Sequence, residues 1–280
     1  MKQKPLRVMS WNIGQIYTPH LRIVKYLFPF LNKGVLPARY LPYVAKTISW
    51  IKPQVVCLQE VRNAEYNPEK VCQLELLERS LKGYKGFYGP ETGGGEHRAL
   101  LVKQNFTVDK RFKVENIKAG RHGVGIAVYV PQKDAWIANL HLEYYDDDIR
   151  KLQVDKIFRW IKHKKENVIL AGDYNMRKSC YLTEKYQTQV HDFFANMKEK
   201  YNFRDASEKI NHTHLLKAKI DYFLANFAQK HKEKTFALTD KRWRFMDHYP
   251  IVGDFVIDTR KKWQKAVDHA SVKRRWIAPQ

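Results

Sequence analysis

Short apolar runs, each only a few residues long, constrain the fold of this chain more than any other feature. Residues 55–59 and 168–171 are almost continuously apolar, which is typical of strands buried on both faces of a sheet. Between such runs, segments such as residues 149–162 carry apolar side chains at near-helical spacing. This alternation, with no internal repeat or flexible linker, predicts a mixed α/β chain with two packed sheets flanked by helices.

The same patterns give the expected elements. The strands are expected at residues 6–11, 55–59, 99–102, 125–130, 136–142, 168–171, 219–224 and 251–257. The helices are expected at residues 44–51, 72–81, 149–162 and 190–201.

The charge of the chain indicates the kind of partner it meets. Of 280 residues, 51 are Lys or Arg and 29 are Asp or Glu, so the formal net charge is +22. Such an excess attracts polyanions, which include nucleic acid, an anionic membrane surface and phosphorylated small molecules. Solubility alone usually needs a smaller imbalance.

Several classes of protein find no support in the sequence. The cysteines Cys57, Cys72 and Cys180 are odd in number and far apart, which predicts neither a disulfide framework nor a zinc site. The first ten residues lack the apolar core of a secretory signal. No run approaches the roughly 20 apolar residues of a membrane helix. We therefore expect a cytoplasmic protein, with export by a route that needs no N-terminal signal left open. We also expect a monomer.

Two basic segments differ from the rest of the chain. Residues 17–43 are aromatic, basic and interrupted by prolines, which predicts an insertion after the first strand. This insertion could be a membrane-surface patch or a loop packed over a sheet. Residues 260–280 are expected to form a solvated basic tail after one domain at residues 1–259.

Polar side chains stand where the apolar runs end. They are Asn12, Glu60, His141, Asp173, Asn175, Asp221, Asp247 and His248. One such residue is usually a cap or turn residue, but repeated strand-end carboxylates are costly unless they are paired or bind a metal. Oxygen ligands select Mg²⁺, Mn²⁺ or Ca²⁺ over zinc, and histidine titrates near neutral pH. We expect these side chains to converge at one end of parallel-running strands.

Six motifs resemble those of the endonuclease/exonuclease/phosphatase superfamily, whose members are deoxyribonuclease I-like metal-dependent phosphoesterases. They are SWNIG at 10–14, LQE at 58–60, NLHLE at 139–143, GDYN at 172–175, KIDYF at 219–223 and DHYP at 247–250. All six follow the family order. The resemblance implies a four-layered α/β sandwich, in which two mixed β-sheets pack face to face with helices outside.

The resemblance also implies a metal site and a hydrolytic activity. By this similarity Glu60 is the main metal ligand, with Asn12 and Asp247 nearby, and the cofactor is Mg²⁺ or Mn²⁺. Asp173 and Asn175 match the pair that orients water and phosphate. A metal on a phosphate oxygen neutralises charge that develops in the transition state.

Three further residues match the proton-transfer groups of the family. His248 matches the general base, and Asp221 matches the acid that orients this histidine. His141 matches a second histidine, which contacts the phosphate or assists the leaving group. An Asp–His pair fixes the imidazole tautomer and stabilises the imidazolium that forms when water loses a proton.

Three functions remain open, and we favour a nuclease because the basic excess is spread along the chain. The alternative is a phosphoinositide phosphatase or a sphingomyelinase-like lipid phosphodiesterase at an anionic membrane surface. Asn175-Met176-Arg177 matches one signature of the inositol-polyphosphate 5-phosphatases, but residues 218–222 lack the other. A non-catalytic polyanion-binding module is disfavoured, because every family position that we identify is present. The expected substrate contacts are Arg177, Lys25, Lys33 and Arg39.

Overall fold

The computed structural model describes most of the chain. The described residues are 4–14, 38–67, 69–91, 95–107, 109–119, 122–176, 184–214, 217–227, 234–239 and 246–257. Most of the expected insertion, including Lys25 and Lys33, lies outside these residues, as do Arg177, Cys180 and the expected basic tail.

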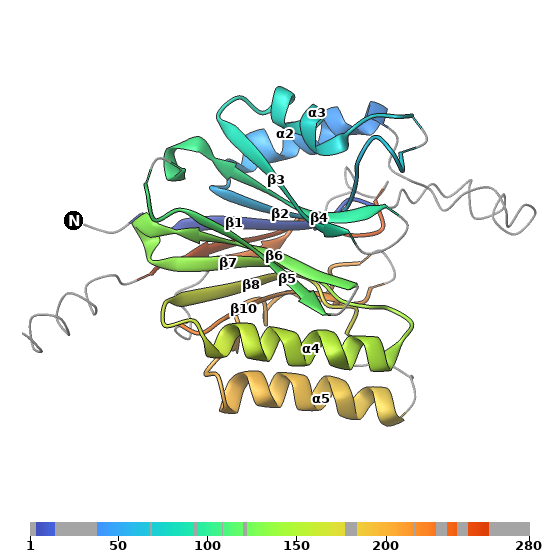
Figure 1. Cartoon of the computed structure of the whole chain (residues 1–280), viewed down its shortest axis with the longest axis vertical. Coiled ribbons are helices and arrows are strands. Elements are labelled where there is room, and N and C mark those ends of the chain that lie inside the picture. The colour runs from blue at the N-terminus through green and yellow to red at the C-terminus, as the bar shows by residue number, and fades with distance from the viewer. Residues whose placement is uncertain are drawn as a thin grey trace, which may run out of the picture.

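Two six-stranded sheets form the body of the molecule (Figure 1). In sheet order, the first contains β11 (Lys234–Ala237), β12 (Ile251–Phe255), β1 (Leu6–Asn12), β2 (Val55–Arg62), β4 (Glu96–Lys103) and β3 (Tyr84–Glu91). The second contains β5 (Lys113–Ala119), β6 (His122–Val130), β7 (Ala135–His141), β8 (Asn167–Asp173), β10 (Asp221–Ala225) and β9 (Arg204–Asp205). Both sheets are mixed, because β1–β2 and β7–β8 are parallel while the other pairs are antiparallel.

Helices cover the outer face of each sheet. Figure 1 shows α2 (Leu41–Ile51) and α3 (Gln73–Ser80) over the first sheet, and α4 (Asp147–Lys162) and α5 (Glu184–Glu199) over the second. The short 3-10 helices are η1 (Ala38–Tyr40), η2 (Gln104–Phe106) and η3 (Pro131–Lys133). The predicted four-layered α/β sandwich is therefore confirmed.

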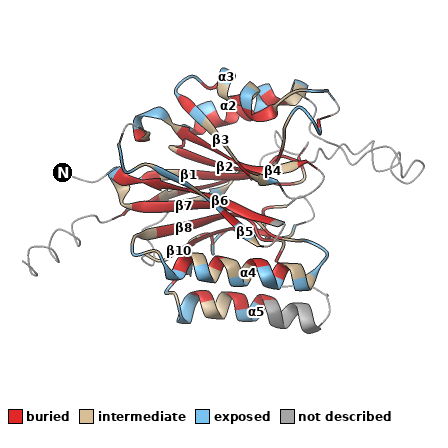
Figure 2. Cartoon of the chain, viewed as in Figure 1, coloured by how far each residue is buried: buried red, intermediate tan, exposed pale blue. Residues whose placement is uncertain are grey.

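Three apolar clusters hold these layers together, and Figure 2 shows that the strands of both sheets are largely buried. One joins the first sheet to α2 and α3 and includes Ile48 and Leu77. A second joins the other sheet to α4 and α5 and includes Ile157 and Phe193. The third lies between the sheets, where buried side chains of both meet. Burial of apolar surface at this scale is the main force that holds such a sandwich together.

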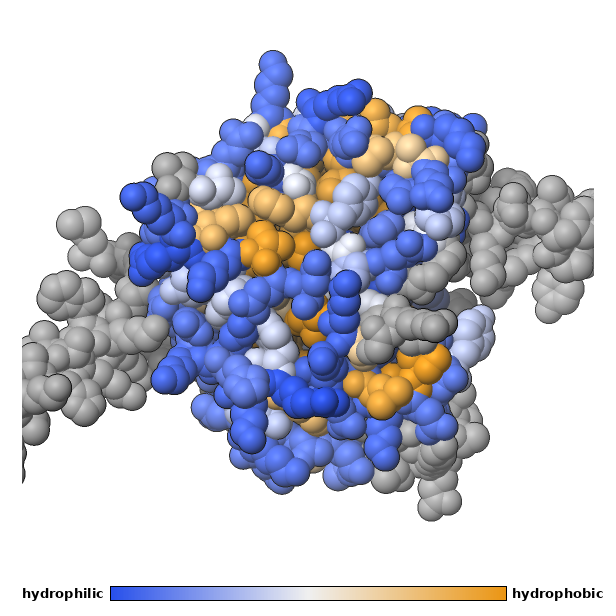
Figure 3. Space-filling view, viewed as in Figure 1, coloured by the Kyte–Doolittle hydropathy of each residue, from blue (hydrophilic) through white to orange (hydrophobic). Residues whose placement is uncertain are grey.

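One face of the molecule is drawn as a space-filling view in Figure 3. The face in Figure 3 is largely hydrophilic, with apolar side chains gathered in separate patches. Within the described residues, we find no helix with the length and apolar character needed to cross a membrane.

Strand direction brings the strand-end polar residues to one edge of the sandwich. The parallel pairs β1–β2 and β7–β8 end at this edge. By contrast, β10 runs antiparallel to β8 and begins there, since Asp221 pairs with Asp173. Likewise β12 is antiparallel to β1, so the segment before it reaches the same edge. The expectation of parallel-running strands is thus right for two pairs and wrong for β10 and β12.

Gly172, in the GDYN motif, provides a test of how tightly β7 and β8 pack. A Cβ atom at Gly172 would lie 1.9 Å from the backbone oxygen of Leu140, and its φ is 144°. We expect Gly172→Ala to lower the free energy of unfolding by at least about 3 kcal/mol. The new Cβ atom would clash with the backbone of Leu140, and β7 and β8 cannot move apart without weakening their pairing. Denaturant unfolding monitored by circular dichroism measures this loss.

Gly83→Ala is the matched control. Gly83 also has a positive φ, of 90°, but a Cβ atom there would meet no heavy atom within 4 Å. This variant should lose only about 1–2 kcal/mol, the cost of the backbone conformation alone. Equal losses in the two variants would show that the approach of Leu140 does not matter.

Candidate active site

Glu60 owes its position to an irregularity in β2. The pairing of β2 with β4 shifts register between Leu58 and Val61, which places a β-bulge at Gln59 and Glu60. Glu60 has a φ of 57°, a conformation that few non-glycine residues adopt. In this position its carboxylate Oε1 accepts a hydrogen bond of 2.8 Å from Asn12 Nδ2.

Asn139 of β7 stabilises this bulge from the opposite sheet. Its Nδ2 donates to the backbone oxygens of Leu58 and Ala99, both at 2.8 Å. Its Oδ1 accepts a hydrogen bond of 2.6 Å from Gln59 Nε2. Buried carbonyl groups need hydrogen-bond partners, and Asn139 supplies them where the β2–β4 pairing is irregular. It thereby stabilises the bulge in the interior.

Asn12 connects an acid of each sheet. Its Nδ2 donates to Glu60 and also to Asp173 Oδ2, at 3.1 Å. The Gly14 backbone N–H donates to Asn12 Oδ1 at 3.0 Å, which fixes the orientation of the amide. Gly14 also leaves room for the acid, since a Cβ there would lie 1.8 Å from Glu60 Oε2. Asn12 therefore presents nitrogen, not oxygen, to the two carboxylates.

His248 and Asp221 form a buried pair. His248 Nδ1 lies 3.0 Å from Asp221 Oδ2, and its Nε2 lies 3.5 Å from Asp173 Oδ2. Trp11 Nε1 donates to the backbone oxygen of His248 at 3.1 Å, and Thr213 Oγ1 accepts from the backbone N–H of Asp221 at 3.1 Å. These hydrogen bonds hold the backbones of His248 and Asp221 in place and so position both side chains.

The charges around His248 determine its protonation. Burial alone would lower the pKa of His248. The carboxylates of Asp221, Asp173 and Asp247 outweigh this effect and raise the pKa well above the ordinary histidine value. Without a bound cation, the imidazole is therefore held as imidazolium at neutral pH.

His141 has the opposite electrostatic environment. Its Nε2 lies 3.7 Å from Glu60 Oε1 and 3.8 Å from Asp173 Oδ2. Burial, followed by the charges of Arg98 and His248, lowers the pKa of His141 well below the ordinary value. Arg98 Nη2 also donates to the backbone oxygen of His141 at 2.5 Å. The imidazoles of His141 and His248 are therefore held in opposite protonation states, neutral and charged.

Asn175 lies at the edge of this group. Its φ is 50°, and its backbone N–H donates to Asp173 Oδ1 at 2.8 Å. Its Nδ2 donates to the backbone oxygen of Leu142 at 2.8 Å. The structure therefore brings together Asn12, Glu60, His141, Asp173, Asn175, Asp221, Asp247 and His248 at one edge of the sandwich.

Of the expected substrate contacts, the structure describes Arg39 alone. Arg39 is exposed on η1, and its guanidinium lies 5.1 Å from the ring centroid of Tyr40. Its role in binding substrate stays a prediction.

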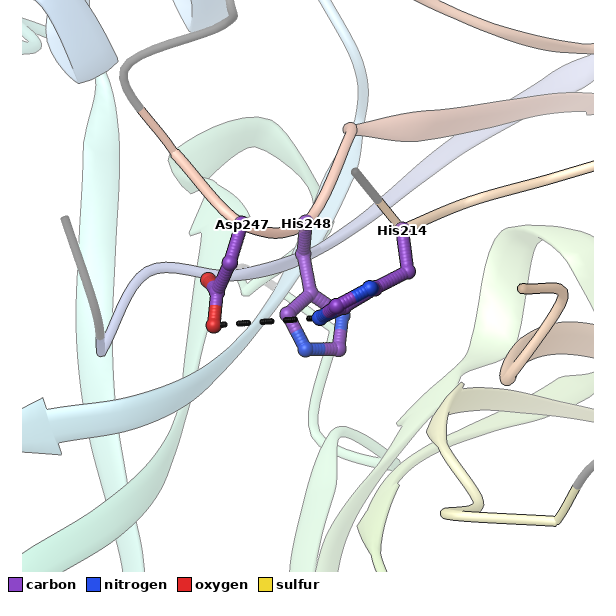
Figure 4. A group of neighbouring side chains, drawn as sticks. All are labelled: His214, Asp247 and His248. Atoms are coloured by element: carbon purple, nitrogen blue, oxygen red, sulfur yellow. Dashed lines mark ion pairs between the residues drawn. The ribbon is translucent and has the colours of Figure 1, made fainter. Parts of the chain in front are cut away.

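Some residues at the site have no role in the sequence analysis. His214 lies in no motif, yet its ring centroid is 4.9 Å from that of His248 (Figure 4). Its sequence signal would have been the closely spaced pair His212 and His214 shortly before Asp221. Arg98 gave no signal, because its strand reads as an ordinary buried one.

Comparison with known proteins identifies the family. A model of the Endonuclease/Exonuclease/phosphatase family matches residues 9–232, most of the chain. The chain belongs to this family. Members are metal-dependent phosphoester hydrolases, and this chain is a phosphoric ester hydrolase. No curated protein matches the sequence.

Solved structures share the fold of this family member. The endonuclease/exonuclease/phosphatase from Bacteroides vulgatus is 14% identical over 91% of this chain and 100% of its own, with a TM-score of 0.63. The human Nocturnin catalytic domain with bound sulfate is 19% identical over 91% and 94%, with a TM-score of 0.59. A mannosyl-6-phosphatase from Bacteroides thetaiotaomicron is 16% identical over 90% and 99%, with a TM-score of 0.57. At these identities the likeness shows the fold alone.

The acids of this family member fit a divalent cation. Burial, followed by the charge of Glu96, raises the pKa of Glu60 to about 8. Burial also raises the pKa of Asp173 to about 7, and it raises the pKa of Asp247. The buried Oδ1 of Asp247 has no hydrogen-bond partner. Crowded, desolvated carboxylate oxygens of this kind are the ligands of a hard cation, and these acids could hold one.

These raised pKa values predict a pH-dependent affinity for Mg²⁺. A cation needs ionised carboxylates, so it must displace the protons that Glu60 and Asp173 retain near neutral pH. Proton competition fades as pH rises through these pKa values, so affinity should increase up to about pH 8 and then level off. Calorimetry in buffers of different ionisation enthalpy measures both affinity and proton release. Glu60→Gln should release fewer protons, whereas a pH-independent affinity without proton release would contradict these assignments.

Proposed function

We propose that this family member is a Mg²⁺-dependent nuclease that hydrolyses nucleic-acid phosphodiesters with a water activated by His248. The observation that carries the proposal is the Asp221–His248 pair, joined at 3.0 Å beside the carboxylates of Glu60 and Asp173. The formal net charge of +22 supports a polyanionic substrate.

In this proposal, Asp221 sets the tautomer of His248. Nδ1–H donates to Asp221 Oδ2, so Nε2 is the atom that takes the proton from water. Asp173 lies on the Nε2 side at 3.5 Å and would orient that water together with Asn175, whose backbone it already binds. Proton transfer by such a positioned base contributes about 10²–10⁴-fold to the rate.

The remaining polar groups would bind the phosphate and the metal. Neutral His141 can donate a hydrogen bond to a phosphate oxygen or to the leaving group. Glu60 and Asp247 would hold Mg²⁺, with Asn12 fixing the carboxylate of Glu60. A bound Mg²⁺ would neutralise charge on the phosphate and offset the carboxylate field that keeps His248 protonated.

Substitutions in the pair test the role of the base. We expect His248→Ala and Asp221→Asn each to lower kcat by about two to four orders of magnitude. The double variant should lose clearly less than the sum of the two free-energy effects, because the residues act as one unit. Single-turnover kinetics with saturating Mg²⁺ measure these rates. Additive losses would show that Asp221 does not act through His248.

A hydrolysis panel tests the substrate class. Plasmid DNA, abasic duplex, RNA, sphingomyelin vesicles, phosphoinositide vesicles and mannose 6-phosphate would be compared in Mg²⁺ and in EDTA. We expect cleavage of nucleic acid only, with an affinity that falls steeply as salt increases. Glu60→Gln is the control for a contaminating enzyme, since it removes a charged metal ligand and should be inactive. Hydrolysis of lipid or sugar phosphate without cleavage of any nucleic acid would overturn the nuclease proposal.

A further inference from the structure

His214 is fixed beside the catalytic pair by backbone contacts. Its backbone forms an antiparallel bridge with that of His248, and the neighbouring Thr213 oxygen accepts from the Tyr249 backbone N–H at 2.7 Å. The two imidazole rings meet edge to face, with centroids 4.9 Å apart and planes at 87°. Figure 4 shows His214 and Asp247 approaching each other in front of the His248 ring.

The three side chains have the arrangement of a metal-binding group. His214 Nε2 lies 4.0 Å from Asp247 Oδ2, which is too long for a hydrogen bond. One ligand atom from each of His214, Asp247 and His248 lies within 4.8 Å of the others. Ligands at about 2.0–2.1 Å from a tetrahedral zinc ion are roughly 3.3 Å apart, so small side-chain rotations would bring these atoms into range.

The chemistry of the donors points to a different ion from the one held by oxygen ligands. Two imidazoles and a carboxylate form a common three-ligand set for zinc, with a fourth position open to water. Magnesium prefers oxygen ligands, whereas imidazole favours borderline-soft ions. Asp247 would be shared by the two sites, because its Oδ2 is the oxygen that faces His214, whereas its other oxygen, the buried Oδ1, has no hydrogen-bond partner.

We propose that His214, Asp247 and His248 form a zinc site that blocks the general base. His248 Nδ1 is engaged by Asp221, so Nε2 is the atom that would bind the ion, in place of the proton that the imidazolium carries there. Binding of the ion would release the Nε2 proton to solvent and would occupy the lone pair that takes a proton from water, so hydrolysis would stop until the ion leaves. The zinc site itself does not depend on the proposed nuclease activity, whereas the inhibition rests on His248 being the base. The expectation of no zinc rested on the cysteines and on the oxygen ligands at the strand ends, and His214 adds a second imidazole beside that of His248.

Zinc binding, measured without any substrate, is the primary test. Calorimetry with Zn²⁺ in millimolar Mg²⁺ should show one tight site per chain. Co²⁺ at the same site should give the visible absorption bands of a four-coordinate ion with nitrogen ligands. His214→Ala should weaken Zn²⁺ binding at this site by at least about 100-fold, because it removes one of three ligands. His212→Ala is the matched control, since this nearby histidine contacts the Tyr249 ring instead, and its zinc affinity should match the wild type.

Two further variants keep the test decisive. Glu60→Gln removes an oxygen ligand of the magnesium site and should leave Zn²⁺ binding intact. His214→Gln, checked by circular dichroism alongside His214→Ala, separates loss of the ligand from loss of the fold.

With any phosphodiester that the enzyme cleaves, micromolar Zn²⁺ should inhibit the wild type and spare His214→Gln, each relative to its own rate without zinc. Failure of the wild type to bind Zn²⁺, or equal affinity in the folded His214 variants, would overturn the site. Binding without inhibition would overturn the blocking role.

Discussion

The hydrogen bonds of Asn139 across the sandwich are the contacts on which the rest of the site depends. Asn139 stands on the second sheet, but it satisfies the backbone of Leu58 and Ala99 on the first, where β2 bulges. The bulge in turn sets the left-handed conformation that turns Glu60 toward Asn12. Neither sheet could place Glu60 alone, so the site forms only when the two sheets pack.

The acids at this edge are held close together at an electrostatic cost. Burial raises the pKa values of Glu60, Asp173 and Asp247, which means that their ionised forms lack solvation. Asn12 offsets part of this cost by donating to two of them. His248 also offsets part of this cost, because it stays protonated and carries a positive charge beside the acids. A divalent cation would remove much of the remaining repulsion, so the same arrangement that strains the metal-free protein favours metal binding.

The sequence predicted the inner strands and missed the outer ones, for a physical reason. Each of the eight expected strands is present, with bounds that differ by a few residues. The strands that the pattern missed are β3, β5, β9 and β11, and these are the edges of the two sheets. Edge strands are half solvated, so they carry no continuous apolar run; β5 has one buried position. The family motifs likewise located the polar residues at the site, but motif matching could not reveal His214, which lies in no motif and is brought to the site by its backbone bridge to His248.

The double contact of Asn12 has a consequence for how such a protein can change. One amide nitrogen reaches Glu60 on one sheet and Asp173 on the other, within 2.8 and 3.1 Å. A slip of one sheet over the other by a single residue is about 3.3 Å, enough to break the bond to Asp173, whereas Glu60 lies on the same sheet as Asn12 and would move with it. The hydrogen bond between Asn12 and Asp173 therefore forms only when the two sheets pack in this one alignment. The loops around this edge, by contrast, can change in length and charge without altering the alignment of the two sheets.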